Sequence, residues 1–313
     1  MPHYLGEVNR LLVEKSRELE GVLHYGENID KGSCLCGIAR GLAGRVVNVG
    51  NCENLHAGLG LGMMLNGGRA VLYVKQLDFL LLALDQLVNT YNLIRAMPQA
   101  VTGSFTIIAI VCDQGYQGPQ SSLDVLSGMC SIGRLRGFSP ASVEEARVIF
   151  GREIGQPGFR IIALSQRLFD SEAIRLEIVN QGRDAGWFQL ETGDQATAVC
   201  FNFSLPQGLE LRRRLAASGT EAAVFTVHPS GLRDCADIVA HAVRSKRLFL
   251  LDDGKEAISG VHELAHRVLA IEPACRVTLM QRDPAAGYGV SSDRFDPFFD
   301  VSPRAGAMEW LHV

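Results

Sequence analysis

Short apolar runs alternate with helix-like segments along most of this chain, and no other feature constrains its fold as strongly. In the first half, the apolar runs predict strands at 45–49, 70–74, 105–111 and 159–164. The periodic segments predict helices at 5–20, 56–65, 79–94 and 143–150. Strands that alternate with helices in this order are typical of a parallel sheet covered by helices, so we expect an α/β fold.

The alternation is interrupted once and then begins again. The polar, glycine-rich segment 180–186 is predicted to be a linker. Beyond it, strands are predicted at 196–201, 222–227, 247–251 and 276–280, and helices at 208–218, 236–243 and 260–269. We therefore expect two consecutive three-layer α/β/α domains with mostly parallel sheets, at 1–183 and 194–283. The remaining tail, 284–313, has no clear pattern.

Composition excludes several classes of protein. With 47% hydrophobic and 20% charged residues in 313, the chain can bury a large core and is not a disordered protein. Thirty basic and 34 acidic residues give a net charge of −4, which argues against a broad nucleic-acid surface. The longest apolar run, 79–84, is too short to cross a membrane, and residues 1–10 lack the layout of a signal peptide. The eight cysteines show no paired spacing, so we expect no disulfide framework and a cytoplasmic location.

His262, Glu263 and His266 match the His-Glu-x-x-His pattern of zinc metalloproteases. Two histidines one helical turn apart would hold zinc, and the glutamate would activate water. Such a site needs a third ligand, for which His228 and His241 are the candidates. Short patterns of this kind also arise by chance in ordinary helices, so zinc hydrolysis is kept only as an alternative.

Two other short motifs have simpler explanations. Gly58, Gly60 and Gly62 resemble part of a dinucleotide fingerprint, but their spacing is wrong and they lie inside a predicted helix. We expect these glycines to let the helix pack closely on its neighbour. Cys34 and Cys36 could bind a soft metal, but without a second pair we interpret them as small buried residues.

Glu53 has a position suited to a functional carboxylate. It follows the predicted strand 45–49 and lies at the start of the glycine-rich helix. In α/β sheets, ligands bind at the carboxyl ends of strands, and a helix N-terminus favours negative charge. The same position also suits an acid that only caps the helix, and position alone leaves both interpretations open.

The chain resembles transketolase-like thiamine-diphosphate enzymes in several segments. Residues 52–74, CENLHAGLGLGMMLNGGRAVLYV, resemble the family's pyrimidine-binding domain. Residues 78–79 and 83–89 are most similar to beta subunits of 2-oxoacid dehydrogenase first components, and 26–29 is similar to the family's opening loop. Residues 193–196 and 250–254 are similar to the transketolase C-terminal domain. The resemblance implies a pyrimidine-binding domain at 1–183 and a transketolase C-terminal-like domain at 194–283.

The resemblance also implies roles for individual residues. Glu53 is similar to the glutamate that hydrogen-bonds a ring nitrogen of the cofactor's aminopyrimidine and so favours its imino tautomer, whose nitrogen removes a proton from the thiazolium carbon. The cofactor supplies the carbanion chemistry, and the protein supplies orientation and a proton path. Phe79 and Leu77 fall near the family's aromatic contacts to the pyrimidine, although leucine departs from that pattern. Glu27, in the opening loop, is a further cofactor-binding candidate.

Half of the family's cofactor site is missing from this sequence. The family's diphosphate domain carries a Gly-Asp-Gly string and a downstream asparagine that hold magnesium and the diphosphate. This chain has no Gly-Asp-Gly anywhere. The resemblance therefore implies an alpha-type partner chain that binds Mg²⁺ and the diphosphate, an active site at the interface, and a heterotetramer of two chains of each type.

A histidine that the family commonly has after the strand 105–111 is also missing. Ser121 or Gln120 occupies its place. Serine can hydrogen-bond, but it cannot act as an acid or base at neutral pH as histidine does. His56, three residues after Glu53, is the candidate substitute on the substrate side.

The resemblance implies a beta-type subunit that cleaves a ketose or a 2-oxo acid and transfers the two-carbon or acyl unit to an acceptor. Gly118 and Pro119 look more like the transketolase branch and favour transketolase-like transfer. Residues 83–89 instead favour a 2-oxoacid dehydrogenase first-component beta subunit, which passes its acyl group to a lipoyl or carrier-protein arm. A non-catalytic assembly subunit is a third alternative, suggested by the missing histidine.

Overall fold

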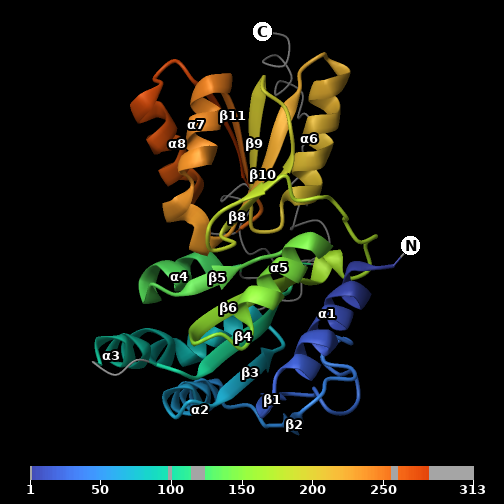
Figure 1. The fold of residues 1–313 in the computed structure, drawn as a ribbon, viewed down its shortest axis with the longest axis vertical. Coiled ribbons are helices and arrows are strands. Elements are labelled where there is room, and N and C mark those ends of the chain that lie inside the picture. The colour runs from blue at the N-terminus through green and yellow to red at the C-terminus, as the bar shows by residue number, and fades with distance from the viewer. Residues whose placement is uncertain (1, 98–100, 114–123, 255–259, 282–313) are drawn as a thin grey trace, which may run out of the picture. The chain divides into compact units, whose positions relative to one another are not determined.

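The computed structural model describes residues 2–97, 101–113, 124–254 and 260–281. The chain forms two compact units, 1–176 and 177–313, and each is described by itself (Figure 1). Both units are built around a mostly parallel sheet with helices, which confirms the predicted α/β class. No helix in these described ranges is long and apolar enough to span a membrane.

The first unit contains a parallel sheet of six strands. They are β1 (Val22–Gly26), β2 (Arg45–Asn48), β3 (Arg69–Val74), β4 (Ser104–Val111), β5 (Arg136–Phe138) and β6 (Gly158–Ser165). Their order in the sheet is β2-β1-β3-β4-β6-β5, and every neighbouring pair is parallel. Every residue of β4 is buried, as its unbroken apolar run predicts for a central strand. Because all strands point the same way, their carboxyl ends meet at one edge.

Helices cover this sheet in two groups. The elements are α1 (Tyr4–Glu18), α2 (Glu53–Leu65), η1 (Leu77–Ala83), η2 (Gln86–Thr90), α3 (Tyr91–Ala96), α4 (Leu126–Gly133), α5 (Val143–Glu153) and the short turn η3 (Gln166–Leu168). Contacts join α2, η1, η2, α3 and α4 into one layer, while α1 packs on α5 (Figure 1). The predicted single helix 79–94 is wrong, because this stretch is a 3-10 turn, a π turn and a short α-helix in succession.

The second unit has a mixed sheet. Its strands are β7 (Asn180–Gln181), β8 (Trp187–Glu191), β9 (Ala196–Phe201), β10 (Ala222–Val227), β11 (Arg247–Asp252) and β12 (Arg276–Gln281), in the order β12-β11-β9-β10-β8-β7. Strands β9 to β12 are parallel, whereas β8 runs antiparallel to both β10 and β7. The predicted linker 180–186 is therefore wrong: β7 and a tight turn occupy it, and the Gly182 amide donates to the Trp187 carbonyl to close the hairpin.

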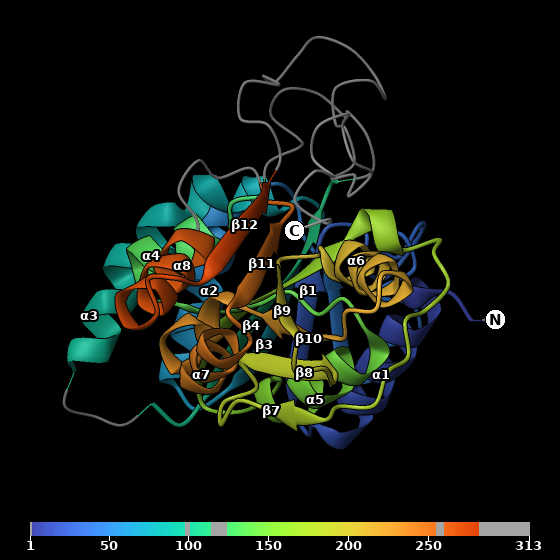
Figure 2. The ribbon, with the colours of Figure 1, turned by 90° about the horizontal axis from the view of Figure 1, so that it is seen from above.

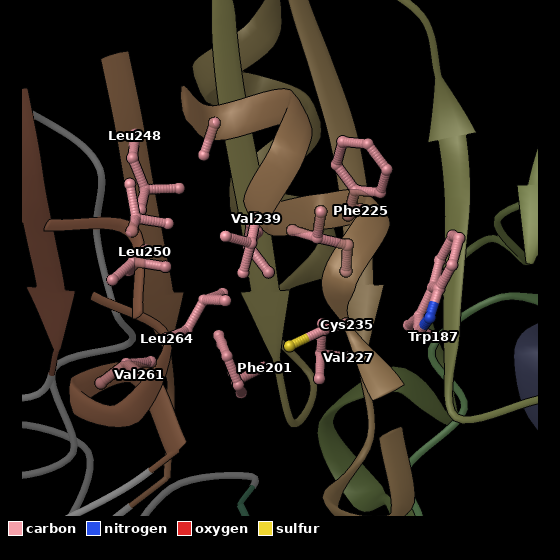
Figure 3. Packing of buried hydrophobic residues seen from close by; sticks show 14 of the residues in the cluster. Trp187, Phe201, Phe225, Val227, Cys235, Val239, Leu248, Leu250, Val261 and Leu264 are labelled. Atoms are coloured by element: carbon pink, nitrogen blue, oxygen red, sulfur yellow. The ribbon is translucent and has the colours of Figure 1, made fainter. Parts of the chain in front are cut away.

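Helices lie on both faces of the second sheet. They are α6 (Leu205–Ala217), α7 (Ala236–Ser245), α8 (Gly260–Ile271) and the short turn η4 (Pro229–Asp234). Figure 2 shows α6 on one side of the sheet and α7 with α8 on the other. Between the sheet and α7–α8 lies a buried core, in which Leu250 of β11, Val239 of α7 and Leu264 of α8 point toward one another (Figure 3). This unit is a three-layer sandwich around its own apolar core.

Candidate functional site

A hollow opens at the carboxyl edge of the first unit's sheet, beside the ends of β1 and β3. Its lining consists of Gly26, Glu27, Glu53, His56, Leu72, Tyr73, Val74, Lys75 and Phe79. From β1 the chain continues to β2 on one side, whereas from β3 it continues to β4 on the other. Such a reversal of strand order is where open α/β sheets bind ligands. The hollow therefore has the position expected of a binding site.

Glu53 is the first residue of α2 and is half-buried at the hollow. The positive end of the helix dipole favours its carboxylate there. Glu53 is not the N-cap residue of α2, since Cys52 has that position, and the Cys52 side chain makes no capping hydrogen bond. Among the described residues, the Glu53 carboxylate has no hydrogen-bond or ion-pair partner. It is available to bind a ligand with a polar N–H group.

His56 lies one turn further along α2 and is buried in the wall of the hollow. The Tyr25 hydroxyl of β1 donates a 2.7 Å hydrogen bond to the His56 carbonyl, and the two rings meet edge to face with centroids 6.3 Å apart. Burial raises the pKa of Tyr25 well above its ordinary value, so the hydroxyl stays a donor. This contact ties the start of α2 to β1 and fixes the helix end that carries Glu53.

Gly26 and Tyr73 form part of the base of the hollow. A Cβ atom at Gly26 would collide with the Tyr73 carbonyl oxygen, so only glycine fits where β1 lies against β3. The Tyr73 hydroxyl lies 3.1 Å from Nδ1 of the buried His24. Burial lowers the pKa of His24 to about 4, so this histidine is neutral at physiological pH. The base is therefore rigid and uncharged.

The structure brings together four of the predicted site residues and leaves others apart. Glu27, Glu53, His56 and Phe79 all line the hollow. Leu77 does not line it, because its side chain is completely buried on the inner side of η1. The substrate-side candidates Ser121 and Gln120, together with Gly118 and Pro119 and the tail 284–313, lie outside the described residues.

Sequence reasoning missed Gly26, Tyr73 and Lys75 as lining residues. Lys75 directly follows β3, so the end of the predicted strand 70–74 was a signal that could have found it. Tyr73 lies inside the strand, and its place in the hollow depends on the pairing of β1 with β3. That pairing joins residues almost fifty positions apart and is not visible in local pattern.

The residues of the zinc pattern do not converge on one point. His262, Glu263 and His266 lie exposed on α8. Of the two candidate third ligands, His241 already bonds Thr197 Oγ1 at 2.7 Å and the Gly193 carbonyl at 2.9 Å. Burial lowers the pKa of His228 to about 3. Across the part of the chain that the structure describes, no three His, Cys, Asp or Glu side chains are grouped to hold a metal ion.

The other two short motifs have structural roles. Gly60 faces β4, where a Cβ atom would overlap the Phe105 ring, so this glycine serves close helix packing as expected. Close packing does not explain Gly62, because no atom lies within 4 Å of the place its Cβ would take. The expectation that Cys34 and Cys36 are buried is wrong, because Cys34 is half-buried and Cys36 is exposed on a loop. No disulfide joins any of the eight cysteines, all of which lie within the described ranges.

The donor set of the hollow fits the aminopyrimidine half of thiamine diphosphate. An aminopyrimidine presents N–H groups and ring nitrogens on a flat apolar ring. The hollow offers the carboxylates of Glu53 and Glu27, which have no partner among the described residues, together with the Phe79 ring. A diphosphate needs cations or a nest of backbone amides. Of the residues that line the hollow, Lys75 is the only cation. The residues present thus fit one half of the group.

Known proteins resemble this chain in sequence and in fold. No protein-family model matches the chain. A curated relative, the pyruvate dehydrogenase E1 component subunit beta of Rhizobium meliloti (strain 1021), is 21% identical over 270 residues, which cover 82% of this chain. The chain spans 58% of that relative's length.

Solved structures share the fold at low sequence identity. A split-gene transketolase described as an inactive beta4 tetramer has a TM-score of 0.66 at 19% identity, covering 88% of this chain and 86% of its own. A transketolase from Campylobacter jejuni subsp. jejuni NCTC 11168 has a TM-score of 0.67 at 13% identity, covering 90% of this chain and 42% of its own. The predicted resemblance to a transketolase-like, beta-type chain is confirmed in sequence and in fold.

Proposed function

We propose that this chain is the beta-type subunit of a two-component thiamine-diphosphate-dependent enzyme and that the hollow beside β1 and β3 holds the aminopyrimidine half of the cofactor. The observation that carries the proposal is Glu53, a carboxylate without a partner among the described residues, which lies at the start of α2 and at the reversal of strand order. The similarity to pyruvate dehydrogenase beta and to transketolases supports it.

The residues of the hollow have distinct tasks in this proposal. When bound, thiamine diphosphate supplies a carbanion centre that can cleave the bond next to a substrate carbonyl. Glu53 accepts a hydrogen bond from the protonated ring nitrogen of the pyrimidine and so holds a proton at that atom. Phe79 packs against the flat ring, and the wall formed by Tyr25 and His56 keeps α2 in place. Glu27 is positioned to accept a second N–H group.

The reaction proposed is cleavage of a ketose or 2-oxo acid and transfer of the two-carbon or acyl unit to an acceptor. Transketolase-like transfer is the first candidate, and a 2-oxoacid dehydrogenase component that serves a lipoyl or carrier-protein arm is the second. The curated relative, a pyruvate dehydrogenase beta subunit, favours the second. A non-catalytic assembly subunit is distinguished from both by substitution of Glu53, as argued in the Discussion.

Titration of thiamine diphosphate with Mg²⁺ tests the split site directly. Because Glu27 and Glu53 serve only the pyrimidine, we expect this chain alone to bind the cofactor at least about a hundredfold more weakly than its complex with the alpha-type chain. Calorimetry on both samples, each at the same Mg²⁺ concentration, measures the difference. Equally tight binding by the chain alone would contradict the need for a partner. A complex that forms but does not bind would favour the assembly-subunit alternative.

The proposed location of the protein is the cytoplasm.

An apolar outer surface on the first unit is proposed to contact partner chains. Five leucines of the adjoining elements α2 and η1 are exposed: Leu55 by 64%, Leu59 by 45%, Leu65 by 43%, Leu81 by 44% and Leu82 by 66%. Exposed apolar patches of this kind are typical of protein interfaces. The split transketolase neighbour, whose beta chains form an inactive tetramer, suggests that this surface also pairs with copies of itself when the alpha-type chain is missing.

Replacing both Leu59 and Leu82 by glutamate should weaken assembly by at least about tenfold, since two buried leucines each contribute about 1.5–3 kcal/mol. Sedimentation of the chain alone and with its partner measures the change. The matched control is Ile271→Glu, which places the same charge on an apolar side chain of the second unit that is 65% exposed. Unchanged assembly of the double variant would contradict this interface.

A further inference from the structure

One side chain ties the loop that carries Glu27 to the neighbouring strand. Asn48, the last residue of β2, accepts two hydrogen bonds at its Oδ1 atom, from the Ile29 amide at 2.8 Å and from the Asp30 amide at 3.0 Å. The backbone adds a third link between the ends of β1 and β2, from the Val49 amide to the Gly26 carbonyl at 3.1 Å. Glu27 lies between these fixed points.

The backbone beside Glu27 needs such support. Asn28 has a φ of 53°, in the left-handed region, which is unfavourable for most L residues and which asparagine adopts more readily than they do. The two amides held by Asn48 are those that follow Asn28 immediately. Strained conformations of this kind persist only where surrounding contacts hold them. The Leu35 amide also donates to the Asn28 carbonyl at 2.9 Å. Loss of the Asn48 acceptor would therefore free only the Ile29 and Asp30 amides, and we expect this to change the direction of Glu27.

The remainder of the loop is anchored independently of Asn48. The Asn9 side-chain amide donates to the carbonyls of Ile38 and Arg40, each at 2.9 Å, and the Ser16 hydroxyl accepts from the Ala43 amide at 2.9 Å. In this far part of the loop, the side chains of Leu35, Ile38 and Ala39 are buried. Loss of Asn48 should therefore disturb only the beginning of the loop, where Glu27 lies, and leave its far end in place.

We propose that Asn48 is a positioning residue of the hollow, which holds the turn at Asn28 so that the Glu27 carboxylate meets the ligand. This inference rests on the proposed function, because it takes the ligand to be an aminopyrimidine with an N–H group for Glu27. Asn48 itself does not line the hollow. Asn48 affects binding only indirectly, by holding the Ile29 and Asp30 amides and so fixing the backbone next to Glu27.

The test uses the full chain and the fragment 4-amino-5-hydroxymethyl-2-methylpyrimidine, which lacks the diphosphate. Asn48→Ala removes the side-chain oxygen that accepts the two hydrogen bonds, whereas Asn48→Asp keeps an acceptor oxygen at this position. Asn51→Ala is the matched control, because Asn51 is an exposed asparagine three residues after Asn48. Fragment affinity is measured by NMR titration, and hydrogen exchange is followed at the Ile29 and Asp30 amides. We expect Asn48→Ala to weaken binding by about fivefold and to speed exchange at both amides by about tenfold. Asn48→Asp and Asn51→Ala should remain within about twofold of the wild-type chain.

The possible outcomes separate this inference from the proposed function. Faster exchange in Asn48→Ala with unchanged fragment affinity would overturn the positioning role and leave a purely structural one. Unchanged exchange would overturn the contact itself. If the wild-type chain does not bind the fragment and Glu53→Ala does not lower the turnover of the assembled enzyme, the proposed function fails. The inference that rests on it then fails as well.

Discussion

Replacing Glu53 by alanine should lower the turnover of the assembled enzyme by about 10²–10⁴-fold, the range in which a positioned proton-transfer group acts. The substitution removes the carboxylate at the start of α2 that, in the proposed function, holds a proton at the pyrimidine nitrogen. Assembly should be unaffected, because Glu53 contributes no hydrogen bond or ion pair within the described part of the chain. Steady-state kinetics and sedimentation on the same preparation measure the two quantities.

Two further variants make the Glu53 result specific. Glu53→Gln keeps the size of the side chain but donates N–H groups and lacks charge, so its turnover should also fall by at least about a hundredfold. Glu20→Gln changes an exposed glutamate of the same unit that lies away from the hollow, and it should retain full turnover. An assembly subunit would behave differently: Glu53→Ala would then assemble normally and lose no activity.

Most of the fold could be predicted from local pattern, and the failures have identifiable causes. The strands β3, β4 and β6 were found because buried parallel strands are unbroken apolar runs. β1 was missed because it carries His24 and Tyr25, whose polar atoms are bonded in the folded protein to Tyr73 and to the His56 carbonyl. The hairpin at 180–191 was mistaken for a linker because its turn is polar and glycine-rich, which is typical of both.

The candidate site was only partly accessible to sequence reasoning. Glu53 could be located because the end of a strand and the start of a helix are both local signals. Leu77 was predicted to lie beside Phe79 at the cofactor, but it does not line the hollow. The sequence does not give the rotation of η1, which buries the Leu77 side chain and turns Phe79, two residues later, toward the hollow. Asn48 was not found at all, since its role depends on hydrogen bonds to residues 18 and 19 positions away.

Replacing Gly60 by alanine should destabilise the first unit, and replacing Gly62 should not. A Cβ atom at Gly60 would overlap the Phe105 ring, which is completely buried in β4. Phe105 cannot withdraw, because its other neighbour is the Phe159 ring, stacked on it with centroids 5.0 Å apart and planes at 16°. Overpacking of this kind costs about 1–3 kcal/mol, and more where the surroundings are rigid. Gly62 has no atom within 4 Å of the place its Cβ would take.

The pair of substitutions isolates packing from helix propensity. Each adds one methyl group to an interior position of α2, so each gains the same contribution of up to about 1 kcal/mol from the better helix former. That gain cancels in the comparison, and the free energies of unfolding of the two variants should differ by about 3 kcal/mol, with Gly62→Ala the more stable. Urea unfolding followed by circular dichroism measures both. Equal stabilities would mean that Phe105 can move, and then the glycine at position 60 would not be explained by close packing of α2 on β4.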